Sequence, residues 1–141
     1  MVAALNRTDR PFGLVVTGEA GDWTSALEQI VGPNVLTTVH VSCDRELLDV
    51  IQRREAHAAV IDDEVNWGMD ALAMLRQVRM LDELFPVVVV TRHSDRRWLE
   101  AALRLAAFSV VAKPLELEEL LRQIRRMMIR LDAFLRDDPL E

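Results

Sequence analysis

Short apolar runs alternate with amphipathic stretches along almost the whole chain, and this alternation constrains the fold more than any other feature. Four runs contain no polar residue, namely 14–16, 58–61, 87–90 and 110–112. Runs of this kind are typical of strands that are buried on both faces of a sheet. A fifth run, residues 35–41, alternates with a period of two and includes polar side chains, which indicates a strand at a sheet edge.

The stretches that follow the five runs carry the periodicity of amphipathic helices. Five strands alternating with five helices predict an α/β fold, a doubly wound five-stranded parallel sheet with helices on both faces. We expect Asp44 to cap the second helix, and either Ser94 or Asp95 to cap the fourth. On the helices themselves, Ile30 and Leu81 are expected to face inward.

Length, charge and cysteine content limit the class of protein. The 141 residues suffice for about one domain, and we expect a loose lead over 1–11, the domain over 12–136 and a tail over 137–141. A net charge of -6 argues against direct nucleic-acid binding, which needs a basic face. The single Cys43 excludes an internal disulfide, and no apolar run approaches the ~20 residues of a membrane span. These features predict a cytoplasmic protein without a membrane contact.

Polar side chains follow the predicted strands at the points where the strands end. Thr17 follows the first, Asp62 and Asp63 the third, Thr91 the fourth and Lys113 the fifth. In doubly wound folds the functional site lies beyond the carboxyl ends of the strands. A carboxylate there can act as a nucleophile that forms an aspartyl phosphate, and a hydroxyl and a lysine can bind the phosphoryl oxygens. The set therefore suits phosphoryl chemistry.

Three motifs in order resemble the receiver domain of bacterial response regulators, over roughly residues 12–125. They are the run 63–72, which reads Asp-Glu-Val-Asn-Trp-Gly-Met-Asp-Ala-Leu, then Thr91, and then Lys113-Pro114. The resemblance implies a flavodoxin-like (βα)5 fold with strand order 2-1-3-4-5 and a signalling domain rather than an enzyme. It also implies that Asp63 is the phosphoacceptor, Thr91 the switch hydroxyl and Lys113 the phosphoryl-binding cation, with a cis bond before Pro114.

Asp62 is the alternative nucleophile. Because neighbours on a strand point to opposite faces, we expect only one of the two aspartates to enter the site. The spacing back from the Met69-Asp70 pair favours Asp63.

The metal site departs from the family pattern. Family members hold Mg²⁺ with an acidic pair at the end of the first strand, and the corresponding positions here are Thr17 and Gly18. Glu19 is one place further on, and it can join Asp63 as a metal ligand only if its loop turns back. The other interpretation is that Glu19 is an exposed loop carboxylate, which predicts weak or absent magnesium binding.

Other departures surround the predicted phosphoryl site. Arg92 replaces a small residue, and it either points to solvent or brings a guanidinium to Asp63 in place of the metal. Val110 stands where the family often has an aromatic switch residue. Trp67 is interpreted as a loop anchor rather than a lid, and His93 as a surface histidine rather than a phosphate neighbour.

The predicted last helix, residues 115–136, carries an apolar seam. Its members follow the spacing 3, 4, 3, 4, 3, and they are Leu117, Leu120, Ile124, Met127, Leu131 and Phe134. Such spacing is that of an a/d heptad seam. We expect the first half of the helix to pack on the sheet. The second half, around Met127, Met128, Leu131 and Phe134, is expected to project beyond it and form an interface, either in a homodimer or with an output domain.

Three functions remain open on the sequence. The first is an atypical receiver that signals through dimerisation or partner contacts, with weak or absent magnesium-dependent phosphorylation at Asp63. The second is a conventional phosphoacceptor that receives its phosphoryl group from a histidine kinase or phosphotransfer protein. The third is a small ligand-binding or enzymatic domain, which the same fold permits.

Overall fold

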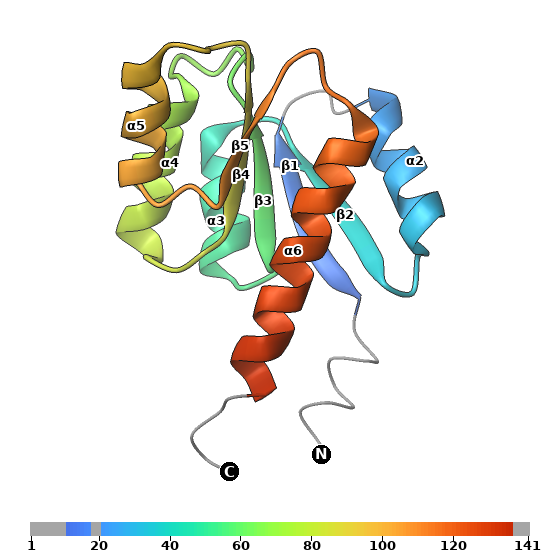
Figure 1. The fold of residues 1–141 in the computed structure, drawn as a ribbon. Coiled ribbons are helices and arrows are strands. Elements are labelled where there is room, and N and C mark those ends of the chain that lie inside the picture. Colours follow the sequence, from blue (N-terminus) through green and yellow to red (C-terminus); the bar gives the residue numbers. More distant parts are fainter. Residues whose placement is uncertain (1–10, 18–20, 137–141) are drawn as a thin grey trace.

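The computed structural model describes the backbone of residues 11–17 and 21–136, and the side chains of residues 11–17 and 23–131. Within these ranges, strands and helices alternate as predicted (Figure 1). The strands are β1 (Phe12–Thr17), β2 (Leu36–Val41), β3 (Ala58–Asp62), β4 (Val87–Thr91) and β5 (Ser109–Ala112). The helices are α2 (Gly21–Val31), α3 (Asp44–Gln52), α4 (Ala71–Leu81), α5 (Arg96–Arg104) and α6 (Leu117–Arg136).

The five strands form one parallel sheet in the order β2-β1-β3-β4-β5. This confirms both the doubly wound fold and the predicted strand order. It also confirms the edge position of the alternating strand, β2, which pairs with β1 alone among the described strands.

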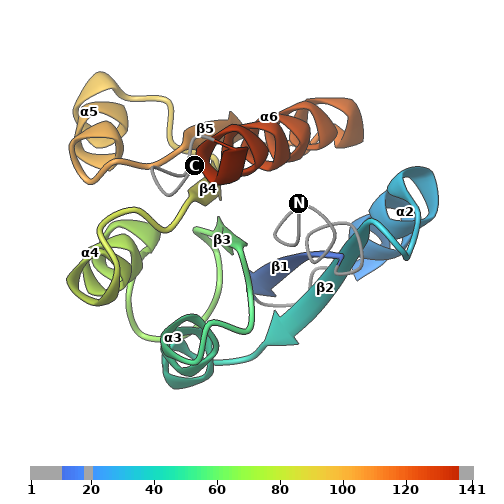
Figure 2. The ribbon, with the colours of Figure 1, turned by 90° about the horizontal axis from the view of Figure 1, so that it is seen from below.

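Two apolar cores cover the two faces of the sheet. One contains Val15, Ile61 and Val89 together with buried side chains of α3, α4 and α5. The other contains Leu14 and Val88 together with buried side chains of α2 and α6. The view along the strands shows α2 and α6 on one side of the sheet and α3 and α4 on the other (Figure 2). Because both faces are covered, β1, β3 and β4 are almost fully buried, as their unbroken apolar runs predicted.

The predicted capping residues of two helices are only partly correct. Asp44 does not cap α3, because Cys43 is the capping residue and makes no side-chain bond there. Instead Glu46 reaches back and accepts hydrogen bonds from the backbone N and the hydroxyl of Ser42, at 2.7 and 2.9 Å. For α5 the second alternative is confirmed, since Asp95 accepts a bond from the backbone N of Trp98.

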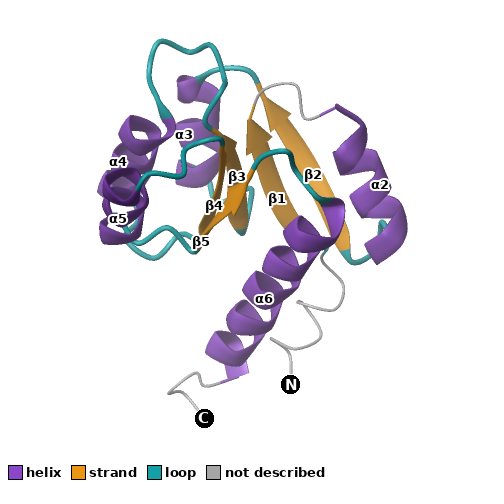
Figure 3. Ribbon diagram, turned by 45° about the horizontal axis from the view of Figure 1, so that its top comes forward, coloured by secondary structure: helices purple, strands orange, loops and turns teal. Residues whose placement is uncertain are grey.

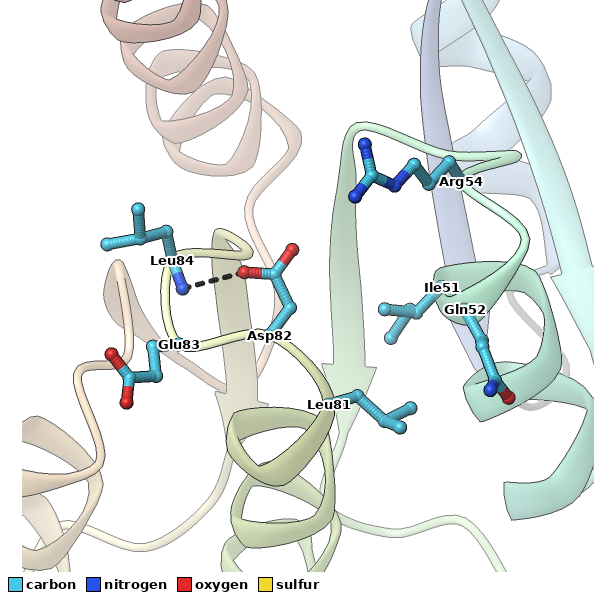
Figure 4. Close-up of a pocket in the computed structure, with 7 residues that line it drawn as sticks. All are labelled: Ile51, Gln52, Arg54, Leu81, Asp82, Glu83 and Leu84. Atoms are coloured by element: carbon cyan, nitrogen blue, oxygen red, sulfur yellow. Dashed lines mark hydrogen bonds between the residues drawn. The ribbon is translucent and has the colours of Figure 1, made fainter.

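The predicted burial of Ile30 and Leu81 is wrong. Their exposed fractions are 54% and 43%. Both lie in the last turn of their helices, where fewer neighbouring side chains cover an apolar residue than in the middle of a helix. Leu81 borders a hollow at the amino ends of β3 and β4, opposite the carboxyl ends of the strands (Figure 4). The hollow is lined by Ile51, Gln52, Arg54, Leu81, Asp82, Glu83 and Leu84.

Candidate functional site

The residues predicted to carry the chemistry gather at the carboxyl ends of the strands. β3 pairs with β4 so that Asp62 lies opposite Val90, and β4 pairs with β5 so that Thr91 lies opposite Ala112. The backbone N of Asp63 donates to the carbonyl of Val90 at 2.9 Å, which extends the β3–β4 pairing to the residue after β3. The loops that follow the strands meet at this end of the sheet (Figure 3).

Asp63 lies at the centre of this end and is 9% exposed. One carboxylate oxygen accepts from the backbone N of Ala71, at the start of α4, at 3.0 Å. The other accepts from the hydroxyl of Thr91 at 3.1 Å. The structure therefore brings together the predicted phosphoacceptor and the predicted switch hydroxyl.

His93 is a further neighbour of Asp63. Its Nε2 lies 3.2 Å from Asp63 Oδ2, and its ring stacks on Trp98 with ring centres 4.6 Å apart. Its backbone N donates to the hydroxyl of Thr91 at 3.0 Å. Although the side chain is 45% exposed, the interpretation of His93 as a plain surface histidine missed this contact. Its position two residues after Thr91 was the one available signal.

Lys113, the predicted phosphoryl-binding cation, pairs with two carboxylates other than Asp63. Its ammonium donates to Asp62 Oδ1 at 2.7 Å and also to the carboxylate of Glu64. The expectation that only one aspartate would enter the site is therefore wrong, because Asp63 binds Thr91 while the long side chain of Lys113 reaches Asp62. The predicted cis bond between Lys113 and Pro114 is present.

Arg92 is 67% exposed, as its interpretation as a solvent-facing side chain predicted, and it pairs with Glu64 instead of Asp63. Its Nε lies 3.1 and 3.2 Å from the two carboxylate oxygens of Glu64. Glu64 therefore binds two cations, Lys113 and Arg92, although the sequence had not singled it out as a site residue. Its only signal was a place directly after Asp63.

These contacts shift two pKa values. The hydrogen bond from Lys113 lowers the pKa of Glu64 below 4.5, despite an opposing effect of burial. Partial burial lowers the pKa of Lys113, but the bonds to Asp62 and Glu64 outweigh it and raise that pKa above its usual 10.5. At neutral pH both groups are charged, so the contact is an ion pair.

The end of β1 provides no carboxylate within the described residues. Thr17 is 4% exposed, and its hydroxyl accepts from the backbone N of Asp62 at 2.8 Å. Gly18 and Glu19 lie outside the described residues, so Glu19 as a metal ligand stays a prediction.

Metal ligands are not grouped among the described residues of the site. In the part of the chain that the structure describes, no three His, Cys, Asp or Glu side chains are grouped to hold a metal ion. Magnesium prefers several oxygen ligands in octahedral geometry, and in the described structure the two oxygens of Asp63 accept hydrogen bonds from Ala71 and Thr91.

Two further predicted positions are partly buried. Val110 packs against the core on the α3–α4–α5 side of the sheet, so an aliphatic side chain fills the place of the family's aromatic ring. Trp67 packs against the same core, which agrees with its interpretation as a loop anchor.

The seam of α6 packs mainly within the domain. Leu120, Ile124 and Met127 are at most 1% exposed and belong to the core on the α2–α6 side. This confirms that the first half of the helix packs on the sheet, but it means that these three residues are not available as interface residues, and the expected projection of Met127 is wrong. Leu117 and Leu131 are partly buried against the same core, and the side chain of Phe134 lies outside the described residues. A helix that packs on a sheet needs the same 3-4 spacing as a helix in a coiled coil.

No helix among the described residues is both long and apolar enough to cross a bilayer.

Comparison with known proteins gives a consistent result. The family profile described as "Response regulator receiver domain" matches residues 18–125. Over 96 residues the chain is 29% identical to the DNA-binding transcriptional regulator NtrC of Klebsiella pneumoniae, a match that covers 64% of this chain and 20% of that protein. The chain thus spans about a fifth of the length of this relative.

Solved structures are similar in fold. One is a CheY-like response regulator receiver domain protein from Methanospirillum hungatei, with a TM-score of 0.73 and 15% identity, covering 87% of this chain and 98% of that one. Another is the beryllofluoride-activated NtrC receiver domain, with a TM-score of 0.68 and 24% identity, covering 86% of this chain and 97% of that one.

Proposed function

The chain belongs to the response regulator receiver domain family, and on this premise we propose that it is an atypical receiver with weak or absent magnesium-dependent phosphorylation at Asp63. Receiver domains of two-component systems pass signals through protein contacts. The proposed domain keeps the scaffold and the Asp63–Thr91 pair of this family. Its output depends on partner contacts more than on phosphoryl chemistry.

The observation that carries the proposal is the end of β1. Thr17 occupies a position where the family has a carboxylate, and its hydroxyl is bound to the backbone of Asp62. A phosphoryl group transferred to Asp63 adds negative charge beside an existing carboxylate, and a cation is needed to neutralise it. Without an acidic pair to hold that cation, the transfer lacks its main electrostatic support.

Phosphate uptake tests the proposal directly. The purified chain is incubated with acetyl phosphate, with and without Mg²⁺, and the covalent phosphate is counted by intact mass spectrometry. We expect sub-stoichiometric labelling that changes little on addition of Mg²⁺. Asp63→Asn serves as the control that assigns any label to Asp63. Complete, magnesium-dependent labelling of Asp63 would refute the proposal.

That refuting result would establish the second candidate, a conventional phosphoacceptor that takes its phosphoryl group from a histidine kinase or phosphotransfer protein. The hydrogen bond from Thr91 to Asp63 favours this candidate, because it places a hydroxyl where it can bind a phosphoryl oxygen.

The outward surface of α6 is the proposed route to a partner. Ile129 is 68% exposed although the seam beside it is buried. In Figure 1 the last turns of α6 run past the lower ends of the strands. An apolar residue on a protruding helix suits contact with a second copy or with an output domain. A concentration series by light scattering, with Ile129→Lys as the variant, tests the dimer, and a strict monomer at high concentration would exclude it.

A further inference from the structure

Glu64 binds two cations of the predicted site. One is Lys113, the predicted phosphoryl-binding residue, and the other is Arg92, which follows the predicted switch hydroxyl Thr91. Lys113 Nζ donates to the Glu64 carboxylate, and Arg92 Nε contacts both of its oxygens. Lys113 is 13% exposed, whereas Arg92 is 67% and Glu64 is 49% exposed. The carboxylate thus bridges a partly buried ammonium and an exposed guanidinium.

A carboxylate and a phosphate offer these cations the same chemistry. Each presents oxygens with negative charge, and both lysine and arginine bind such oxygens by charge-assisted hydrogen bonds. An oxyanion that enters beside Thr91 and Lys113 must therefore compete with Glu64 for both cations, and with Asp62 for the ammonium of Lys113, which lies 2.7 Å from Asp62 Oδ1.

We propose that Glu64 is a built-in occupant of the oxyanion site at the carboxyl ends of β3, β4 and β5, and that it sets the affinity of this site for phosphate. The inference rests on the proposed function, because it concerns the same site, and it names the residue that controls it. Glu64 acts through Lys113 and Arg92, so it is a positioning residue.

Exposure makes this occupant displaceable. Ion pairs at the surface are weak, since water and salt screen them. A phosphate dianion carries more charge than a carboxylate and can replace it at sufficient concentration. Glu64 is therefore expected to weaken anion binding without abolishing it.

The test is non-covalent binding of inorganic phosphate to the whole chain, without Mg²⁺. Titrations at constant chloride are followed by the NMR shifts of the backbone amides of Thr91 and Lys113. We expect Glu64→Gln to bind phosphate about tenfold more tightly than the wild type, an effect of the size that one nearby charge exerts at a partly screened site. Glutamine keeps the length of the side chain and removes only its charge.

Two control variants separate direct competition from a general change in charge. Glu116→Gln removes the same charge from an exposed side chain three residues after Lys113, and it should change phosphate affinity less than about twofold. Lys113→Met in the Glu64→Gln background should abolish the gain, because its source is the ammonium, which Glu64 has released and Asp62 alone still holds.

Equal affinity of Glu64→Gln and wild type would overturn the inference. So would an equal gain from Glu116→Gln, or a gain that survives loss of Lys113. Acetyl phosphate labelling remains an independent measurement. Strong magnesium-dependent labelling of the wild type contradicts the proposed function alone, whereas an unchanged phosphate affinity in Glu64→Gln contradicts this inference alone.

Discussion

Two strands of the sheet, β1 and β4, end in a buried threonine, and the two hydroxyls have different hydrogen-bond partners. Thr17 is 4% exposed and accepts a hydrogen bond from the backbone of Asp62. Thr91 is fully buried and donates to the carboxylate of Asp63, while it accepts from the backbone of His93. The first hydroxyl binds main chain, and the second binds the side chain expected to carry the chemistry.

The comparison separates the scaffold from the chemistry. A neutral hydrogen bond connects the end of β1 to the end of β3, so this edge of the site needs neither carboxylate nor metal to be held together. The ends of β3, β4 and β5 keep a carboxylate, a hydroxyl and an ammonium. Under the proposed function, the metal half of the site is lost while the phosphoryl half remains in place.

The largest expected effect comes from giving the end of β1 the acidic pair of the family. The double variant Thr17→Asp, Gly18→Asp should raise the initial rate of magnesium-dependent labelling by acetyl phosphate at least about tenfold, which corresponds to ~1.4 kcal/mol of transition-state stabilisation. Intact mass measured over time gives the rate. Asp63→Asn in the same background should remove the label, and an unchanged rate in the double variant would show that more than the acidic pair is missing.

The next effect is on stability. Thr17→Val keeps the shape of the side chain but leaves the backbone N of Asp62 without its acceptor. Loss of a buried partner costs ~1–3 kcal/mol of unfolding free energy, which urea denaturation measures. Thr37→Val, on the partly exposed edge strand β2, is the matched control and should stay within about 0.5 kcal/mol of wild type. Equal losses of unfolding free energy in the two variants would mean that the hydrogen bond of Thr17 adds no stability beyond that of an edge-strand threonine.

Thr91→Val should cost less than Thr17→Val, although Thr91 is the more deeply buried of the two. The reason is that Asp63 keeps its hydrogen bond from the backbone N of Ala71 when the Thr91 hydroxyl is removed. We expect a loss of ~0.5–1.5 kcal/mol in the same urea experiment. If Thr91→Val lost more unfolding free energy than Thr17→Val, Thr91 would be the threonine that matters more for stability, which contradicts the comparison.

The alternation of strands and helices was predictable from periodicity, whereas the strand order came from the resemblance to the receiver family. Apolar runs without alternation identified the buried strands, and the one alternating run identified the edge strand β2. The site was predictable to the extent that backbone position defines it. Asp63 and Thr91 each lie at or next to a strand end and need only short side chains to meet.

The remaining predictions failed for two reasons. Long side chains have several possible partners, and one apolar spacing fits two kinds of helix packing. Lys113 and Arg92 can each reach several carboxylates, and a sequence does not say which one they choose. Glu64, which lies 49 positions from Lys113 and 28 from Arg92, was therefore missed. On α6 the packed part of the seam was expected to end before Met127, whereas Met127 is buried too. The spacing could not locate this boundary, since burial against a sheet and burial in a coiled coil require the same spacing.

The smallest expected effect is a pH dependence of stability. It comes from the Glu64 ion pairs at the carboxyl ends of β3, β4 and β5. The hydrogen bond from Lys113 lowers the pKa of Glu64 in the folded chain below the ordinary 4.5. A group with a lowered folded pKa stabilises the fold fully above its unfolded pKa, and this contribution is lost as the pH falls through the folded pKa. The contribution should therefore be constant from pH 6 to 8 and decline below about pH 4.5.

Glu64→Gln isolates this contribution because glutamine does not titrate. Melting temperatures of wild type and variant, compared at a series of pH values, should differ slightly and constantly near neutral pH and converge in acid. Glu116→Gln provides the control for the loss of an exposed charge near the site. A difference in melting temperature that persists or widens below pH 4 would mean that the ionised carboxylate of Glu64 does not stabilise the ends of β3, β4 and β5. The contrast between these strand ends and the end of β1 would then rest on Thr17 and Thr91 alone.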